Sequence, residues 1–127
     1  MDINTHLAID RRLCGTPVAI DTRYARVEMA LTEEMTADAA GLVHGGFIFG
    51  LADYAAMLAV NDPNVVLGGA DVTFLKPVAI EERVVAEASV EDVKGKKHVV
   101  HVMVKRETET VFRGVFTCFV LEKHVLE

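Results

Sequence analysis

The residues best suited to chemistry are gathered in one stretch, from His44 to Asp53. Asp53 is the only formally charged residue between Gly41 and Val60, a segment that is otherwise almost entirely apolar. A carboxylate buried among apolar side chains is costly unless it is paired or protonated, and such a group can serve as a nucleophile or a general base. Ahead of it stand His44 and two glycines, whose N–H groups could bind an oxyanion at a helix start.

The spacing of these groups implies a second copy of the chain. His44 and Asp53 are nine residues apart. In one helix this spacing is about 180° around the axis and about 13 Å along it. Side chains so placed cannot meet on one small group. If they cooperate, Asp53 of one chain must face His44 and Gly45 of another, between two antiparallel helices, so we expect an obligate dimer.

Each candidate also has a structural explanation. Asp53 could cap a loop or pair with an arginine, the two glycines could serve helix capping and tight packing, and His44 could be an N-cap residue. Asp38, six residues before His44, could polarise a substrate carbonyl when protonated or order a water, and is otherwise a solvated loop acid. Asp71 could face the cleft or the contact between the two chains.

Composition narrows the class of protein. The 127 residues predict one domain, residues 1–127, with enough apolar residues for a packed core. A net charge of −6 argues against a general nucleic-acid partner, although single basic residues could still attract a phosphorylated ligand. Cys14 and Cys118 fit no metal spacing, and His98 and His101 lack a third ligand, so no metal is expected. Reduced thiols, no signal pattern and no apolar window of spanning length favour a cytoplasmic protein without a membrane partner.

Hydrophobic periodicity predicts one buried helix among strands. The helix is expected from Gly46 to Val60, apolar on every side, and a short amphipathic helix from Thr5 to Leu13. One strand over Val18–Leu31, with a bulge, and a polar loop over Thr32–Leu42 precede the long helix. Four strands are expected after it, at Val65–Leu75, Arg83–Val93, Lys97–Arg106 and Thr110–Glu122. The sum is an α+β protein in which a curved antiparallel sheet wraps around one long central helix, with edges that a partner sheet could shield.

The pattern Gly41-x-x-His44-Gly45-Gly46-x-x-x-x-Leu51-Ala52-Asp53-x-Ala55, followed by Phe74-Leu75-Lys76-Pro77, resembles the hotdog-fold acyl-CoA thioesterases of the phenylacetate-degradation (PaaI-like) type. The element order agrees with that family over nearly the whole chain. The resemblance implies that the acid at Asp53 attacks the thioester or activates water, while the Gly45 N–H holds the carbonyl oxygen. It also implies a site between subunits of a homodimer or homotetramer, and coenzyme A as part of the substrate with no further cofactor.

Two positions depart from that family. Its members usually carry Asn or Gln where this chain has Asp38, and often Ser or Thr where it has Gly68, nine residues before Pro77. These departures predict weaker carbonyl polarisation or water held in another way. The predicted catalytic residues are Asp53, Gly45, His44 and Asp38, the predicted substrate-binding residues are Gly46, Phe47, Tyr54, Gly68 and Asp71, and the acyl pocket is expected to include Phe47, Phe49, Tyr54 and Met57.

The predicted function is hydrolysis of acyl-CoA thioesters, and two alternatives stay open. The first is a hotdog enoyl-CoA hydratase or dehydratase, because His44 and Asp53 supply the histidine and carboxylate that such enzymes pair. The second is a non-catalytic module that binds or senses acyl-CoA, an alternative that the departures at Asp38 and Gly68 keep open.

Overall fold

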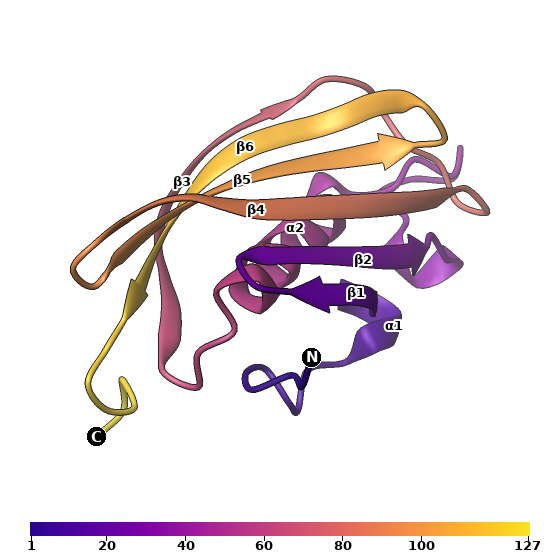
Figure 1. Cartoon of the computed structure of the whole chain (residues 1–127). Coiled ribbons are helices and arrows are strands. Elements are labelled where there is room, and N and C mark those ends of the chain that lie inside the picture. Colours follow the sequence, from indigo (N-terminus) through magenta and orange to yellow (C-terminus); the bar gives the residue numbers. More distant parts are fainter.

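A computed structural model of residues 1–127 shows a curved six-stranded antiparallel sheet around one long helix (Figure 1). The strands lie in the order β1-β2-β4-β5-β6-β3. The elements in chain order are α1 (Arg11–Cys14), β1 (Thr16–Asp21), β2 (Tyr24–Ala30), a 3-10 turn (Glu33–Met35), α2 (Gly45–Val60), β3 (Val65–Phe74), β4 (Arg83–Lys94), β5 (Lys97–Arg106) and β6 (Glu109–Val120).

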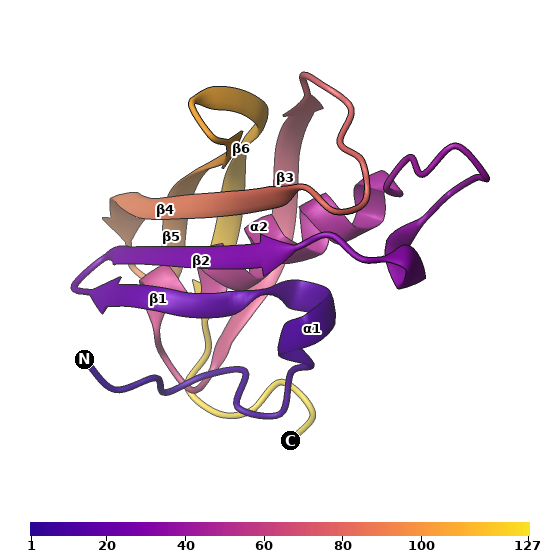
Figure 2. The same ribbon diagram turned by 90° about the vertical axis from the view of Figure 1, so that its right-hand side faces the viewer.

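The long helix α2 confirms the prediction to within one residue. It begins at Gly45 with His44 as N-cap, and it ends at Asn61, whose backbone is left-handed with φ 55°. The helix packs against the concave face of the sheet, where it contacts β4, β2 and β5 (Figure 2). None of the helices is long and apolar enough to cross a membrane.

The alternation predicted for β5 is also confirmed. Val100, Val102 and Val104 are buried on the side of α2, while His101 and Met103 point to the outer face. Figures 1 and 2 show that no helix covers this outer face. The core is therefore a single layer between α2 and one side of the sheet.

The predicted helix over Thr5–Leu13 is wrong except for the short α1. His6 has a positive φ of 53°, which breaks the helical path. Residues before α1 instead form an irregular segment tied to the end of α2, where the Asn61 side chain accepts from the Asn4 N–H and donates to the Asp2 carbonyl. Ile3 and Ile9 pack on the core from this segment, so tertiary contacts outweigh its weak helical pattern.

The single strand predicted over Val18–Leu31 is two strands, β1 and β2, which form a hairpin. The chain turns at Thr22 and Arg23, where Arg23 has a φ of 59° and the Asp21 carboxylate accepts from the Thr22 N–H. The expected bulge is present in β1, between Pro17 and Ala19. The sheet therefore has six strands, one more than predicted.

The last strand in the order, β3, pairs only with β6 and leaves one edge of the sheet open. Its middle residues Gly68, Gly69, Ala70 and Asp71 are largely accessible. Backbone N–H and C=O groups along such an edge can pair with another strand. The chain thus keeps a long, accessible edge beside α2.

Candidate functional site

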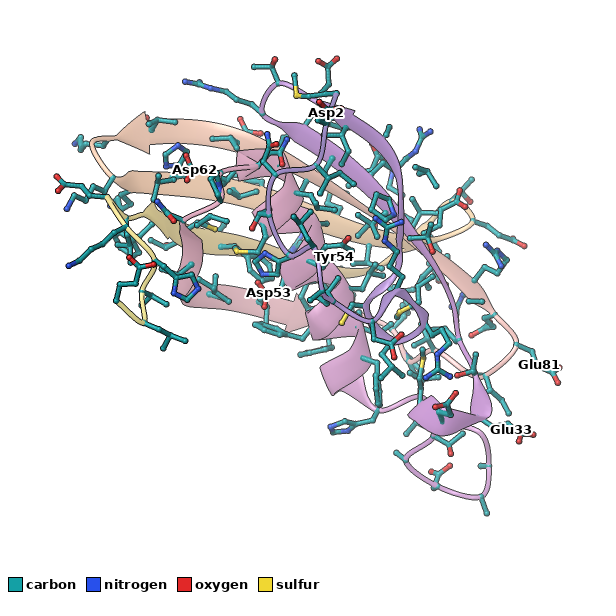
Figure 3. The ribbon with its side chains drawn as sticks, turned by 90° about the horizontal axis from the view of Figure 1, so that it is seen from below. Asp2, Glu33, Asp53, Tyr54, Asp62 and Glu81 are labelled. Carbon is teal, nitrogen blue, oxygen red and sulfur yellow. The ribbon has the colours of Figure 1, made fainter.

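Asp53 has no partner in the chain that would explain it structurally. It lies in the middle of α2, partly buried, and its Oδ1 is inaccessible and accepts no hydrogen bond (Figure 3). No arginine or lysine forms an ion pair with it. Burial among apolar groups raises the pKa of Asp53 to about 6. The carboxyl group therefore ionises close to neutral pH, as a general base requires.

One face of α2 is left uncovered by its own chain. Gly46 is exposed, and Phe49, Gly50 and Asp53 are partly exposed, at the three- and four-residue spacings of one helix face. A Cβ added at Gly50 would meet nothing within 4 Å. The prediction of a helix buried on all sides is thus wrong for a single chain, and Asp53 lies on the face that remains open.

The start of α2 carries unused backbone donors. Neither the Gly45 nor the Gly46 N–H has an acceptor in the chain, and the His44 side chain makes no capping hydrogen bond. Two close contacts depend on the glycines, because an added Cβ would lie 3.1 Å from the Phe74 ring at Gly45 and 3.0 Å from the His44 ring at Gly46. Free N–H groups and the helix dipole together favour a negative oxygen at this point.

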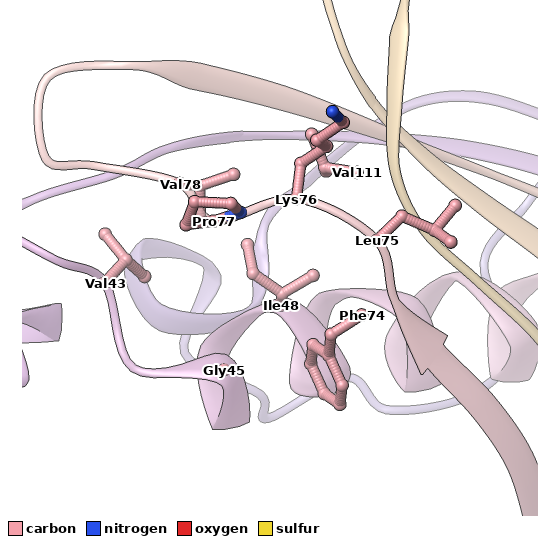
Figure 4. Close-up of a pocket in the computed structure, with 9 residues that line it drawn as sticks. All are labelled: Val43, Gly45, Ile48, Phe74, Leu75, Lys76, Pro77, Val78 and Val111. Carbon is pink, nitrogen blue, oxygen red and sulfur yellow. The ribbon is translucent and has the colours of Figure 1, made fainter.

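A hollow of about 280 Å³ lies directly beside the helix start (Figure 4). Apolar side chains from three stretches of the sequence form most of its wall, and Lys76 is its one charged residue. The lining residues are Val43, Gly45, Ile48, Phe74, Leu75, Lys76, Pro77, Val78 and Val111. Gly45, whose N–H has no acceptor in the chain, thus lines an apolar space of ligand size.

Comparison with known proteins places this arrangement in a family. A profile of the thioesterase superfamily matches residues 40–112, which is more than half of the chain. The chain belongs to the thioesterase superfamily. The matched range contains α2, the hollow and Gly68, one of the two departures noted in the sequence.

Two solved structures show the same fold. An uncharacterised protein from Pyrococcus horikoshii, PH1136, is 54% identical, with a TM-score of 0.99 over 100% of this chain and 98% of that one. A mutant of the phenylacetic acid degradation protein PaaI from Thermus thermophilus is 26% identical, with a TM-score of 0.79 over 86% of this chain and 95% of that one. The fold is therefore the hotdog fold of PaaI-like thioesterases, as the sequence predicted.

Two curated relatives carry other names. The methylthioribose-1-phosphate isomerase of Aquifex aeolicus is 51% identical over 123 residues, which are 96% of this chain and 27% of that protein. The transcription factor FapR of Thermoanaerobacter pseudethanolicus is 30% identical over 123 residues, 92% of this chain and 62% of that protein. This chain spans less than two thirds of either protein, so neither name assigns it an activity.

Asp38 lies in the exposed loop between the 3-10 turn and α2, a loop that projects from the body of this thioesterase fold (Figure 2). Its Oδ1 accepts from the backbone N–H of Ala40 at 3.0 Å and of Leu42 at 3.3 Å. The base of the loop is closed where Thr36 bridges to Val43, next to His44. Asp38 therefore holds its own loop, and within one chain its carboxylate is exposed and directed at no other predicted site residue.

Two aromatic candidates, seven residues apart, lie on the same side of α2 but at different points along its axis. Phe47 is partly exposed near the helix start, and its ring meets that of His44 edge-on at 6.2 Å between centroids. Tyr54 is 1% exposed, with its ring 6.2 Å from that of His6 and its hydroxyl without a partner. Tyr54 thus packs under the N-terminal segment, away from the hollow.

Gly68 and Asp71 occupy β3 in different ways. Gly68 forms a bulge, and an added Cβ would lie 2.3 Å from the Phe119 ring, so a serine or threonine would displace that ring. Asp71 pairs across from Val115 and lines a hollow on the outer face together with His101 and Arg113. Asp71 therefore faces away from α2, and of the two positions considered for it only a contact with a second chain stays a prediction.

Within one chain the structure brings only His44, Gly45, Gly46 and Phe47 together. Asp53 stands eight residues further along the continuous helix, about 12 Å from Gly45 along the axis. Cys14 and Cys118 were given no role, yet both lie close to Asp53. Burial and, to a smaller degree, the Asp53 charge raise the pKa of both thiols, that of Cys118 to about 12. No group of three or more His, Cys, Asp or Glu side chains is placed to hold a metal ion.

The lining of the hollow was mostly missed from the sequence. Ile48, Val78 and Val111 look like ordinary core residues, because a buried apolar residue carries no local sign of the space next to it. Phe74, which covers Gly45, was part of the quoted motif but received no role. Pro77 could have indicated the role of Phe74. It shows that β3 ends nearby, and both residues line the hollow beside the helix start.

Proposed function

We propose that this protein hydrolyses acyl-CoA thioesters to a free acid and coenzyme A, with Asp53 as the reacting carboxylate. The observation that carries the proposal is a carboxyl group with no partner, placed on the uncovered face of α2 and with its pKa raised to about 6. A structural role would require a hydrogen bond or an ion pair, and the chain supplies neither. Membership of the thioesterase superfamily supports the same reaction class.

A second copy of the chain would complete the site. The uncovered stripe of α2 runs from Gly46 to Asp53, and its midpoint lies between Phe49 and Gly50. When two such stripes pack antiparallel about a two-fold axis, Asp53 of one chain lies beside Gly45 and Gly46 of the other. The open edge of β3 would pair with its copy in the same assembly. The smallest active unit is therefore a homodimer, from which a homotetramer could be built, and we place it in the cytoplasm.

In the proposed reaction the start of α2 binds the thioester oxygen, and Asp53 supplies the reacting carboxylate. The Gly45 N–H, with Gly46 next to it, holds the thioester oxygen as it becomes negative. Asp53 of the other chain attacks the carbonyl carbon, or removes a proton from a water that attacks it. The carbon–sulfur bond then breaks and coenzyme A leaves as a thiolate, which needs little protonation because a thiol has a pKa of about 8.5. In the first route, water then cleaves the resulting anhydride and returns the Asp53 carboxylate.

The test is release of free thiol from a panel of acyl-CoAs by the wild type and by Asp53→Asn. We expect turnover of at least one thioester, and a loss of about 100-fold or more in kcat for the variant. Asp92→Asn is the matched control, because it makes the same change at an exposed position of β4. Full activity in Asp53→Asn would contradict the proposal.

A second function is favoured by one comparison, that with the transcription factor FapR. A regulator needs to bind a ligand without consuming it, and this chain carries Asp38 and Gly68 where thioesterases of the PaaI type usually have other residues. In this alternative the protein is an acyl-CoA sensor. Tight binding of acyl-CoA by calorimetry, with no thiol release, would support it.

The same panel also addresses hydration. Crotonyl-CoA added to the wild type would lose its enoyl absorbance without thiol release if the protein were a hydratase. His44 is exposed at the N-cap, and Asp53 is placed on the opposite side of the same helix, so the pair would have to come from two chains in that case as well.

A further inference from the structure

The hollow beside Gly45 is suited to one part of an acyl-CoA. Its wall is formed by Ile48, Phe74, Val78 and Val111 with their neighbours, and it adjoins the N–H that would hold the thioester oxygen (Figure 4). Two parts of the substrate extend from that carbonyl, the acyl chain and the pantetheine arm. The two differ in polarity, since the arm contains two amide groups and the acyl chain can be pure hydrocarbon.

Several backbone groups around the hollow already have hydrogen-bond partners within the chain. The N–H groups of Leu75 and Lys76 both donate to the Val111 carbonyl, at 2.8 and 3.2 Å. The Val78 carbonyl accepts from Val43 at 2.9 Å, and the Pro77 carbonyl accepts from Arg106 at 3.0 Å. An amide placed here would exchange water for these occupied groups and a mostly apolar wall, which is less favourable than placing a hydrocarbon there.

The charges around the hollow also favour the acyl chain as its occupant. The ammonium group of Lys76 points away from Ile48 and Phe74, on the side of Val111 (Figure 4). The remaining lining side chains are uncharged. A chain that ends in a carboxylate would therefore be poorly matched, and a neutral hydrocarbon would be well matched.

From these observations we infer that the acyl chain occupies this hollow, and that the substrate is a neutral acyl-CoA of medium length. The inference rests on the proposed hydrolysis. The hollow measures about 280 Å³. A methylene group takes about the space of a water molecule, about 30 Å³, so the hollow holds on the order of nine carbons. It replaces the acyl pocket expected from the sequence, because Tyr54 and Met57 are each 1% exposed and do not line this hollow.

The test is kcat/KM across a series of straight-chain acyl-CoAs from acetyl to dodecanoyl, with succinyl-CoA as the charged comparison. For the wild type we expect a rise of about fourfold for each added methylene until the hollow is full, near octanoyl or decanoyl. Succinyl-CoA should be a poorer substrate than butyryl-CoA. A flat profile, or a preference for succinyl-CoA, would overturn the inference.

Two variants move the optimum in opposite directions. Val78→Phe fills the hollow and should shift the preferred chain to shorter lengths, while Phe74→Ala enlarges it and should shift the preference to longer ones. Because Phe74 is 53% exposed, Phe74→Ala should fold. It tests the inference even if Val78→Phe does not fold. Val93→Phe is the control, because Val93 is 37% exposed at the far end of β4 and lies near the end of α2. An unchanged profile in both folded variants would overturn the inference.

Failure of the proposed hydrolysis is distinguishable from failure of this inference. If the wild type releases thiol but the variants keep its chain-length profile, only the inference fails. If no thioester is hydrolysed, hydrolysis fails and the inference is decided by Kd for the same acyl-CoAs. A Kd that falls with chain length and shifts in the two variants then supports it, and equal Kd values across the series overturn it.

Discussion

At the scale of single residues, both the proposed activity and the predicted pH dependence of stability rest on the ionisation state of Asp53. Its ordinary pKa is 3.8, and burial raises the pKa to about 6 in the folded chain. No hydrogen bond compensates its Oδ1. Burying a carboxyl group without a hydrogen-bond partner lowers the stability of the fold, and such groups are typical of functional sites.

The pH dependence of hydrolysis follows from this pKa. Only the ionised carboxylate can attack a carbonyl or take a proton from water. We therefore expect kcat/KM to rise with pH through about 6, the pKa of Asp53, and then to level off. Initial rates measured from the acid side of this pKa to mildly alkaline pH check this. A rate that is constant over that range, or highest at the acid end, would show that another group controls the reaction.

Stability should change with pH in the opposite sense. Below about pH 4 Asp53 is protonated in both the folded and the unfolded chain, and above about pH 6 the folded chain carries a buried charge, so the free energy of unfolding falls between these values. Asp53→Asn removes the charge and should raise the free energy of unfolding at about pH 8 by about 1–3 kcal/mol. Urea unfolding on either side of this window tests this, and a variant no more stable than wild type at the alkaline end would contradict it.

At the scale of elements, α2 is a helix of 16 residues with three glycines, Gly45, Gly46 and Gly50. Each glycine inside a helix costs about 0.5–1 kcal/mol relative to alanine. Gly45 and Gly46 make room for the rings of Phe74 and His44, whereas Gly50 meets nothing in its own chain. Contacts within one chain therefore explain why glycine is needed at the first two positions. At Gly50 only packing against a second chain would explain it.

The role of the Gly45 N–H can be separated from the space around it. Gly45→Pro removes the N–H at the first helical position, where proline is well accepted, and the His44 ψ of 130° suits a following proline. We expect a loss of about 100-fold or more in kcat. Gly45→Ala is the matched control, because it also displaces the Phe74 ring but keeps the N–H. Equal losses in the two variants would mean that space, not the donor, is what matters.

Gly50 tests whether α2 meets a second helix. In an isolated chain Gly50→Ala should be stabilising by about 0.5–1 kcal/mol, because it adds helix propensity without a clash. If α2 packs against its copy at this point, Gly50→Leu should separate the dimer and abolish hydrolysis while the circular dichroism spectrum stays native. Analytical ultracentrifugation measures the assembly, and an intact, active Gly50→Leu dimer would rule out close helix contact there.

At the scale of the whole molecule, one chain is incomplete in two ways at once. The edge of β3 has no pairing partner on one side, and the stripe from Gly46 to Asp53 on α2 is uncovered. The carboxylate and the nearest oxyanion donor are about 12 Å apart along the same helix. A single two-fold assembly would pair the edge of β3, cover the stripe on α2 and bring the carboxylate of one chain next to the N–H donors of the other.

Complementation tests the shared site directly. Asp53→Asn and Gly45→Pro should each be nearly inactive alone, because each removes one half of both sites in a dimer. Refolded together in equal amounts, half of the dimers are mixed, and each mixed dimer has one intact site, so about a quarter of wild-type activity should return. Activity that stays at the level of the separate variants would show that both groups act within one chain.

Much of the architecture could be predicted from the sequence because its signals are local. The apolar run ended by Asn61 fixed α2 to within one residue, and the valine alternation in β5 fixed which face is buried. The predictions failed where tertiary contacts outweigh a local pattern. The N-terminal segment abandons its helical pattern to pack Ile3 and Ile9 on the core, and Arg23 divides one predicted strand into a hairpin.

The candidate site divides in the same way. The sequence by itself determined that Asp53 sits in an apolar helix behind two glycines, and that one helix could not bring these groups together, because helical geometry depends only on spacing. Only the tertiary structure decided that Asp53 lacks a partner, that Asp71 faces outward, that Phe119 fills the space above Gly68, and that a hollow adjoins Gly45. Those facts depend on which distant side chains come within a few ångströms, and residue types and spacing along a chain do not specify that.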